Sequence, residues 1–301
     1  MDLKKLYAWC AVPVEKLEGH PELKVPFRLA ADSAAMGRLM AEELVDDIEA
    51  ANREGRALRA IIPCGPSCWY KPFETLVNSR GVSLKNLHVF HMDECLDWEG
   101  RLLHPEDPYN FRSSMERHFY GGIRPELAVP PAQRHFLSPG TMEEIRAEIH
   151  RLPVDVTYGG WGQDGHVAYN QARRMPYSPA TLEQLRGSSI RLQYNNEDTV
   201  LALAQRVYGT AYQFVPPMSV TLGLLECLGA KKVRLFSDTG AWKQTALRVG
   251  LFSPPDPEYP MTLLQEHPDA MLTATLDTAR HPFSLNPQWK FSGVNDDGAA
   301  V

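Results

Sequence analysis

The chain has 301 residues, 44% of them hydrophobic, so it can bury the core of one large α/β domain. Its 31 basic and 37 acidic side chains give a net charge of −6, which argues against a nucleic-acid binder that neutralises many phosphates but allows a basic pocket for one small anion. No run of about 18 apolar residues predicts a membrane span.

The N-terminal residues do not have the pattern of an export signal. Two lysines precede a short apolar run that Pro13 interrupts, and no cleavage site follows. The five cysteines form no even framework, so we expect reduced thiols in a cytoplasmic protein. We predict an irregular N-terminal extension over 1–24, one domain over 25–280 and a polar tail over 281–301.

From Asp32 onward, helical patterns alternate with short apolar runs. Asp32 or Ser33 can cap a helix that reaches Ile48, and Gly81 can end the next one. The other helices are predicted over 109–120, 141–152, 197–208, 220–228 and 242–249. Strands are predicted over 58–62, 87–90, 154–158, 190–193, 232–236 and 270–276. This alternation predicts a Rossmann-like α/β fold, with a mostly parallel sheet and helices on both faces.

Ligands of such folds bind beyond the carboxyl ends of the strands. Four segments follow predicted strands in this way, and we expect them to lie close together. They are residues 64–70, 91–96, 159–171 and 237–243.

Two carboxylates, Asp93 and Glu94, directly follow the apolar run that ends at Phe90. They could simply open a solvated loop. Alternatively, adjacent like charges in a pocket raise the pKa of one carboxyl, which suits a general base near neutral pH.

A glycine-rich segment, Gly159 to Asn170, contains Asp164-Gly165-His166. Glycines allow close backbone approach to a ligand, and an aspartate two residues before a histidine can orient the ring. A glycine-rich turn with a structural histidine is the plainer interpretation. The Asp-Gly-His combination makes proton transfer by His166 the favoured one.

Several motifs occur in the order found in one enzyme family. They are Met92-Asp93-Glu94, His104-Pro105-Glu106 with Tyr109, Gly159-Gly160-x-Gly-x-Asp-Gly-His-Val-Ala-Tyr-Asn170, Val215-Pro216 through Gly223, Gly240-x-x-Lys243 and His267-Pro268-x-Ala270. From about residue 25 to about residue 277, the chain thereby resembles the glucosamine-6-phosphate deaminase/isomerase family, which is related in fold to 6-phosphogluconolactonase.

The resemblance implies an open-chain mechanism on a phosphorylated amino sugar, without a metal or redox cofactor. It implies that His166, held by Asp164, assists ring opening, and that Asp93 removes the C2 proton before ammonia leaves. Gln171 is counted with these catalytic residues, since it can hold the imidazole ring by a hydrogen bond. The resemblance also implies contacts to substrate or its phosphate from Gly65, Ser67, Glu94, Gly160, Arg206 and Lys243.

The chain departs from the family pattern at two places. Cys64-Gly65-Pro66-Ser67-Cys68 stands where the family has Gly-Gly-Thr-Pro, and Pro66 lacks a backbone donor. Gln171 stands where the family has glutamate, so it cannot stabilise imidazolium by charge. The reaction type is therefore better supported than the identity of the sugar.

Other functions fit parts of the pattern. An aldose–ketose isomerase would use the same base and histidine, and a non-catalytic sensor could retain the fold. A 6-phosphogluconolactonase fits less well, because Tyr169-Asn170 and Cys95 replace its usual residues after the histidine and after Asp-Glu. The cysteine and histidine spacings match no standard zinc pattern. We expect a small phosphorylated sugar as partner and neither nucleic acid nor membrane; a homo-oligomer is compatible with the sequence.

Overall fold

The computed structural model describes residues 1–172 and 179–286. Within them, a seven-stranded sheet forms the centre, in the order β1-β10-β9-β6-β2-β3-β5, and every pairing in it is parallel. The strands in this order are β1 (Phe27–Ala30), β10 (Ala270–Thr275), β9 (Lys232–Ser237), β6 (Val156–Gly159), β2 (Leu58–Ile62), β3 (Leu87–His91) and β5 (Arg134–His135). The predicted Rossmann-like α/β fold is confirmed.

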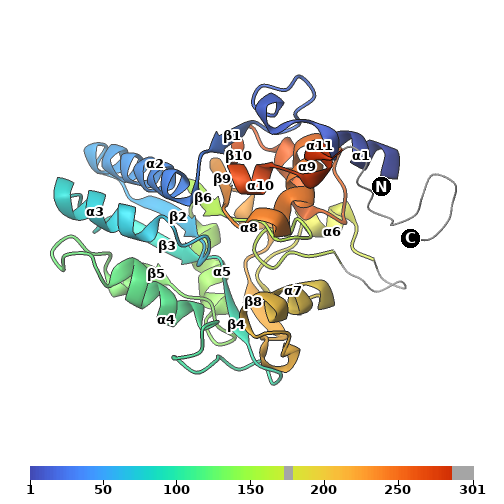
Figure 1. Cartoon of the computed structure of the whole chain (residues 1–301). Helices are drawn as coiled ribbons and strands as arrows, with labels where there is room; N and C mark the ends of the chain where they lie inside the picture. Colours follow the sequence, from blue (N-terminus) through green and yellow to red (C-terminus); the bar gives the residue numbers. More distant parts are fainter. Residues whose placement is uncertain (173–178, 287–301) are drawn as a thin grey trace, which may run out of the picture.

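Helices cover both faces of this sheet (Figure 1). The α-helices are α1 (Leu3–Ala11), α2 (Ser33–Arg53), α3 (Tyr70–Arg80), α4 (Phe111–Met115), α5 (Met142–Arg151), α6 (Leu182–Arg186), α7 (Glu197–Val207), α8 (Leu224–Cys227), α9 (Gln244–Phe252), α10 (Leu276–Ala279) and α11 (Pro282–Leu285). Shorter helical turns are η1 (Val14–Lys16), η2 (Glu116–Tyr120, a π-helix), η3 (Pro131–Gln133), η4 (Tyr212–Phe214), η5 (Gly240–Lys243) and η6 (Pro260–Glu266).

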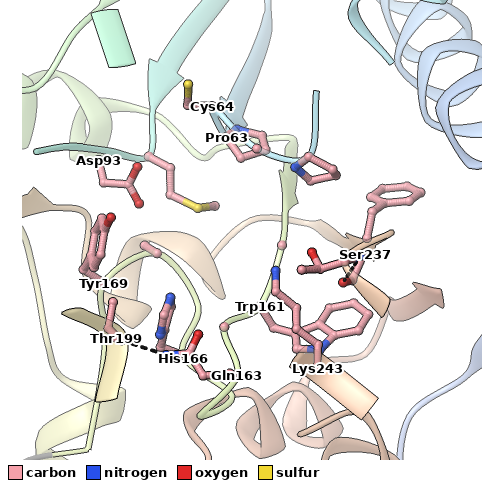
Figure 2. A pocket seen from close by; sticks show the side chains of 18 of the residues that line it. Pro63, Cys64, Asp93, Trp161, Gln163, His166, Tyr169, Thr199, Ser237 and Lys243 are labelled. Carbon is pink, nitrogen blue, oxygen red and sulfur yellow. Dashed lines mark hydrogen bonds between the residues drawn. The ribbon is translucent and has the colours of Figure 1, made fainter. Parts of the chain in front are cut away.

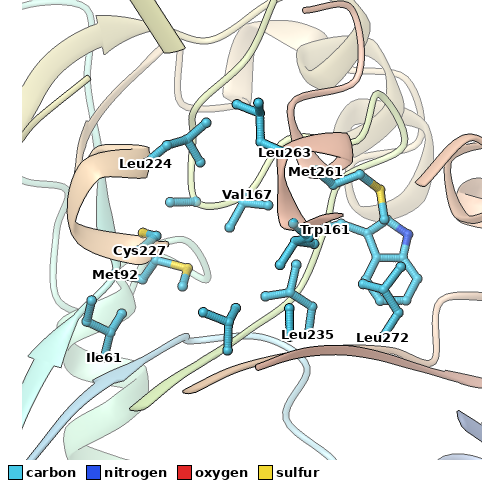
Figure 3. Close-up of a cluster of buried hydrophobic side chains, with 14 of the residues drawn as sticks. Ile61, Met92, Trp161, Val167, Leu224, Cys227, Leu235, Met261, Leu263 and Leu272 are labelled. Atoms are coloured by element: carbon cyan, nitrogen blue, oxygen red, sulfur yellow. The ribbon is translucent and has the colours of Figure 1, made fainter. Parts of the chain in front are cut away.

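Strand β2 shows how the two faces are filled. Successive strand residues point to opposite faces, and all five residues of β2 are buried. Ala60 and Ile62 pack in one apolar cluster with α2 and α3, whereas Ile61 packs in another with residues from α5 and α9. Figure 3 shows part of this second cluster, in which Leu235 and Leu272 of the sheet lie near Trp161, and Ile61 lies near Met92. A strand buried on both faces reads as a continuous apolar run, which is why β2 was predictable.

A second, three-stranded antiparallel sheet extends from the first. Its order is β4 (Asp93–Leu96), β8 (Met218–Thr221) and β7 (Arg191–Tyr194). Only Met92 separates β4 from the end of β3. The chain therefore passes directly from the carboxyl edge of the main sheet into this smaller one.

Most predicted elements are present, but one helix was predicted with the wrong bounds. The predicted helix over 220–228 is wrong in its first part, because Val220 and Thr221 belong to β8 and only Leu224–Cys227 is helical. Val220, Leu224 and Cys227 are all buried and recur at helical spacing, so a strand followed by a short helix imitated one helix. The predicted strand over 190–193 exists as β7, but it belongs to the small antiparallel sheet.

We expected an irregular N-terminal extension, but the structure has a helix there. Asp2 accepts a hydrogen bond from the Lys4 N–H and begins α1. Helix α1 packs against α9 and α11, and the Tyr7 and Phe283 rings stack with centroids 5.0 Å apart. The division at residues 24 and 280 stays a prediction. Among the described residues, no helix is long and apolar enough to cross a membrane.

Candidate active site

The four segments that follow β2, β3, β6 and β9 meet around one cavity. It has a volume of about 400 Å³, and each of the four predicted segments lines it. Asp93, His166, Arg206 and Lys243 all reach this cavity, as do Gly65, Ser67 and Gly160. Figure 2 shows Asp93 and Tyr169 at one end, Ser237 and Lys243 at the other, and His166 between them. The predicted convergence at the carboxyl edge is confirmed.

The turn that carries His166 depends on glycine at two positions. A Cβ atom at Gly162 would lie 2.1 Å from His166 Cε1, so the space beside the imidazole exists only because residue 162 has no side chain. Gly165 has a φ of +73°, which glycine adopts without steric cost. Ala168 also has a positive φ, of 53°, although it carries a side chain. The turn is therefore shaped around the histidine.

Asp164 orients the His166 ring from behind. Its Oδ1 lies 2.5 Å from His166 Nδ1, which assigns the proton to Nδ1 and leaves Nε2 for the cavity. Burial opposes ionisation of Asp164, but the charge and hydrogen bonds of His166 prevail and lower its pKa to about 2. Asp164 is thus an ionised, buried carboxylate that holds the imidazole ring in place.

Gln171 supports Asp164 rather than the imidazole. Its Nε2 group donates to Asp164 Oδ2 at 3.1 Å and to Thr199 Oγ1 at 2.5 Å, and its Oε1 accepts the Asn196 N–H at 2.9 Å. Both amide protons are used in this way, and His166 Nδ1 already donates to Asp164. Although Gln171 Nε2 lies 3.3 Å from Nδ1, no proton is left for a bond between them. The proximity predicted for Gln171 is present, with a neutral amide group beside Asp164.

Asp93 begins β4 and faces the cavity. Burial, and secondarily the charge of Glu94, raise its pKa to about 7. A carboxyl group that titrates near neutral pH can accept a proton from carbon and return it, which is what a general base requires. The geometry and the electrostatics of Asp93 both match the predicted role.

Glu94 was predicted to contact the substrate, but it lies away from the cavity. Its side chain is buried and does not line the cavity. Its carboxylate accepts backbone N–H groups of Cys95, Phe111 and Arg112, at 3.0, 2.7 and 2.7 Å. Burial raises the pKa of Glu94 to about 7, although the three N–H groups stabilise the charged form and act to lower the pKa. Glu94 therefore fixes the start of α4, and it contacts no substrate space.

The small antiparallel sheet holds Asp93 and the histidine turn in register. Asp93 pairs with Thr221 across β4 and β8, and Thr221 Oγ1 accepts the Tyr169 N–H at 3.0 Å. Asn170 Nδ2 donates to the Leu222 carbonyl at 2.8 Å and its Oδ1 accepts from Arg191 at 2.8 Å. One strand, β8, thus positions both catalytic candidates.

The opposite end of the cavity is cationic. Burial, and secondarily the charge of Arg206, lower the pKa of Lys243 to about 8. Among residues 1–172 and 179–286, no carboxylate lies within ion-pair distance of either side chain. The Arg206 guanidinium instead lies over the Trp242 ring, 5.7 Å from its centroid. Lys243 ends the turn η5 and precedes α9, so it stands just before the long helix rather than inside it.

Sequence reasoning missed several lining residues. Thr199 and Leu203 line the cavity together with Arg206. These three residues lie at i, i+4 and i+7 of α7, so one face of the predicted helix contained them once Arg206 was singled out. Cys64 and Asp238 also line the cavity, and no pattern in the sequence singled out Asp238. In the described part of the chain, no three His, Cys, Asp or Glu side chains gather as a metal site would require.

The comparisons with known proteins agree with the resemblance that the sequence motifs indicate. No family model matches the chain. Glucosamine-6-phosphate deaminase from Aliivibrio fischeri strain MJ11 is 27% identical over 248 residues, covering 79% of this chain and 85% of the relative. The enzyme of the same name from Caenorhabditis elegans is 29% identical over 220 residues, covering 70% and 74%. The chain is similar to glucosamine-6-phosphate deaminases.

Two solved structures share the fold. A monomeric glucosamine-6-phosphate deaminase aligns with a TM-score of 0.66 at 21% identity, covering 84% of this chain and 98% of that one. A 6-phosphogluconolactonase from Shewanella baltica OS155 aligns with a TM-score of 0.56 at 18% identity, covering 83% and 97%. The predicted relationship of the fold to both enzymes is thereby confirmed.

Amide substitutions should separate the roles of the two adjacent carboxyls. The pKa of Asp93 in the folded protein lies above the value of about 4 expected when unfolded, so its ionisation costs stability as pH rises from about 4 to about 7. Asp93→Asn should gain stability relative to the unmodified protein across that window and then level off. Glu94→Gln should lose about 1–3 kcal/mol at pH 8, because an amide nitrogen would meet a backbone N–H. Urea unfolding at pH 5 and pH 8 measures both effects; a pH-independent difference for Asp93→Asn, or a neutral Glu94→Gln, contradicts them.

Proposed function

We propose that this protein is an enzyme that converts a phosphorylated amino sugar to a ketose phosphate with release of ammonia, as glucosamine-6-phosphate deaminases do. The observation that carries the proposal is the layout of one cavity. A carboxyl group with a pKa of about 7 and a histidine held by an ionised aspartate face one end. Two cations face the other end, and no carboxylate of the described residues lies within ion-pair distance of them. The names of the similar proteins support the same reaction.

The proposed chemistry uses Nε2 of His166 first. It carries a proton between the ring oxygen and the anomeric hydroxyl, which opens the sugar to its aldehyde. Asp164 stabilises the imidazolium that forms during this transfer. Ring opening is required because only the open-chain aldehyde acidifies the proton on C2.

Asp93 then removes the C2 proton as its ionised form. The product is an enol that carries the amino group, and return of a proton to C1 converts it to an imine at C2. Water adds to this imine and ammonia leaves, which gives the ketose. The conversion of the aldehyde to the imine moves protons only, and a base that titrates near pH 7 can both accept and return them. In the last step a C–O bond to water forms and the C–N bond to ammonia breaks.

Lys243 and Arg206 are proposed to hold the phosphate, together with Ser67 and the backbone of Gly65 and Gly160. A phosphate at this end supplies the negative charge that the two cations lack. It would also anchor the far end of the substrate, so that C1 and C2 extend toward His166 and Asp93.

An aldose–ketose isomerase without ammonia release is the alternative reaction. The same base and histidine would serve an aldose with a hydroxyl group at C2. A cytoplasmic location, which free cysteines suit, stays a prediction as well.

A panel of phosphorylated amino sugars and phosphorylated aldoses tests the function. Ammonia and ketose should form in equal amounts from a 2-amino sugar phosphate. Ketose formation from aldoses alone would establish the isomerase, and no turnover of any member would establish a binding protein instead.

Lys243→Ala should raise KM for the phosphorylated sugar at least tenfold while changing KM for the unphosphorylated sugar little. The reason is that the lost cation contacts phosphate and not the sugar ring. Lys231→Ala, which removes an exposed lysine paired with Asp155, is the matched control and should change neither value. Equal effects of Lys243→Ala on both sugars would mean that Lys243 does not contact phosphate.

Gln171→Glu should move the acidic limb of the kcat/KM profile to higher pH. The new carboxylate adds negative charge beside Asp164 and favours protonated imidazole, so the neutral form needed for proton uptake appears later. Gln171→Met serves as control, because it removes the hydrogen bonds to Asp164 and Thr199 without adding charge. If the profiles of all three proteins superimpose, residue 171 is not coupled to the catalytic histidine.

A further inference from the structure

A second cavity lies beside the candidate active site. It is an open groove of about 720 Å³ between the first half of α3 and the α4–η2 segment. Helix α3 contributes Lys71 and Glu74, and the facing segment contributes Ser114, Arg117 and His118. The functions argued above make no use of this groove.

The groove carries more positive than negative charge. Lys71 pairs with Glu74 at 2.5 Å, which leaves Arg117 as the extra cation. Arg117 Nε donates to the Ser113 carbonyl at 3.2 Å, and no carboxylate in the described part of the chain lies within ion-pair distance of its guanidinium. His118 is exposed on the same segment and adds a further nitrogen donor. Two hydroxyl groups, those of Ser67 and Ser114, complete the polar lining.

The local backbone explains why these side chains gather. Residues 116–120 form one π-helical turn instead of continuing α4. Such turns are uncommon and widen the helix, and they occur often at functional sites. Arg117 and His118 are exposed there, while the following Phe119 and Tyr120 are buried against α3 and its neighbours. The turn thus exposes two donors on the side of the groove while its aromatic residues anchor it.

The groove and the candidate active site share a wall. Ser67 lines both cavities. Cys64 lines the active-site cavity, and its thiol is hydrogen-bonded to Ser114, which lines the groove. The Tyr70 hydroxyl, also in the groove, donates to the Cys64 carbonyl. A ligand in the groove would therefore touch the loop that closes the catalytic cavity.

We propose that this groove is a second anion site, which binds phosphate or the phosphate of a phosphomonoester. Arg117, the lysine that pairs with Glu74 and two hydroxyl groups can donate hydrogen bonds to the several oxygens of a phosphate. The anion can be a separate molecule or a second phosphate on a sugar that occupies the catalytic cavity. The proposal is independent of the deaminase reaction, since it requires only binding.

The test uses the full-length Arg206→Ala/Lys243→Ala protein, in which the cations of the catalytic cavity are absent. Inorganic phosphate is titrated calorimetrically at low ionic strength. One site should persist in this background, and adding Lys71→Ala or Arg117→Ala should weaken it at least tenfold. Lys16→Ala, at an equally exposed lysine on η1, is the matched control and should change the affinity less than twofold.

A second arm identifies the source of the phosphate. It compares a hexose bisphosphate with a hexose monophosphate on the otherwise unmodified protein and on Arg117→Ala. A loss of affinity confined to the bisphosphate assigns the groove to a second group of one ligand, whereas a loss confined to inorganic phosphate assigns it to a separate anion. Absence of residual phosphate binding in the double variant, or equal weakening by Lys16→Ala, overturns the proposal.

Discussion

The pairing of β4 with β8 is the constraint on which the candidate site depends. It places Asp93 opposite Thr221, and the Thr221 hydroxyl holds the backbone of Tyr169, three residues after His166. A proton-abstracting carboxyl and a ring-opening histidine must lie within one sugar's length of each other. Because they come from segments more than 70 positions apart in the sequence, one strand that contacts both is the simplest way to fix their separation. A shift of β8 by one residue would turn Thr221 away from Tyr169.

Charge is divided along the cavity in the way that an open-chain sugar phosphate requires. Burial, and secondarily the charge of Glu94, raise the pKa of Asp93. The Glu94 carboxylate accepts backbone N–H groups and does not occupy substrate space. Gln171 brings no second charge to Asp164, which leaves His166 with a single ionised partner. The cations stand at the other end, and among the described residues no carboxylate lies within ion-pair distance of them, although Asp238 also lines the cavity. A phosphate therefore has one favourable end of the cavity, and this sets the direction of the substrate.

Much of this arrangement was predictable from local patterns, and the errors have physical causes. Strands such as β2 are buried on both faces, so their apolar runs identified the sheet and hence its carboxyl edge. The small antiparallel sheet was not predicted, because β4 is only four residues long and begins with two acidic residues. One of these, Glu94, is buried and accepts backbone N–H groups from α4. Glu94 was misassigned for the same reason. Thr199 shares one face of α7 with Arg206, and Asp238 lies in a segment expected at the site, but neither residue type by itself indicated a contact with the cavity.

The central claim is that Asp93 exchanges a proton with carbon, and hydrogen exchange at C2 measures this most directly. Glucosamine 6-phosphate is incubated in deuterated water with the protein or with Asp93→Asn, and the C2 proton of the remaining substrate and the C1 protons of the ketose product are followed by NMR. The account predicts loss of the C2 proton with the unmodified protein and its complete retention with Asp93→Asn, which should bind the sugar within a few-fold of the original affinity. Exchange at an unchanged rate in the Asp93→Asn protein would contradict the account.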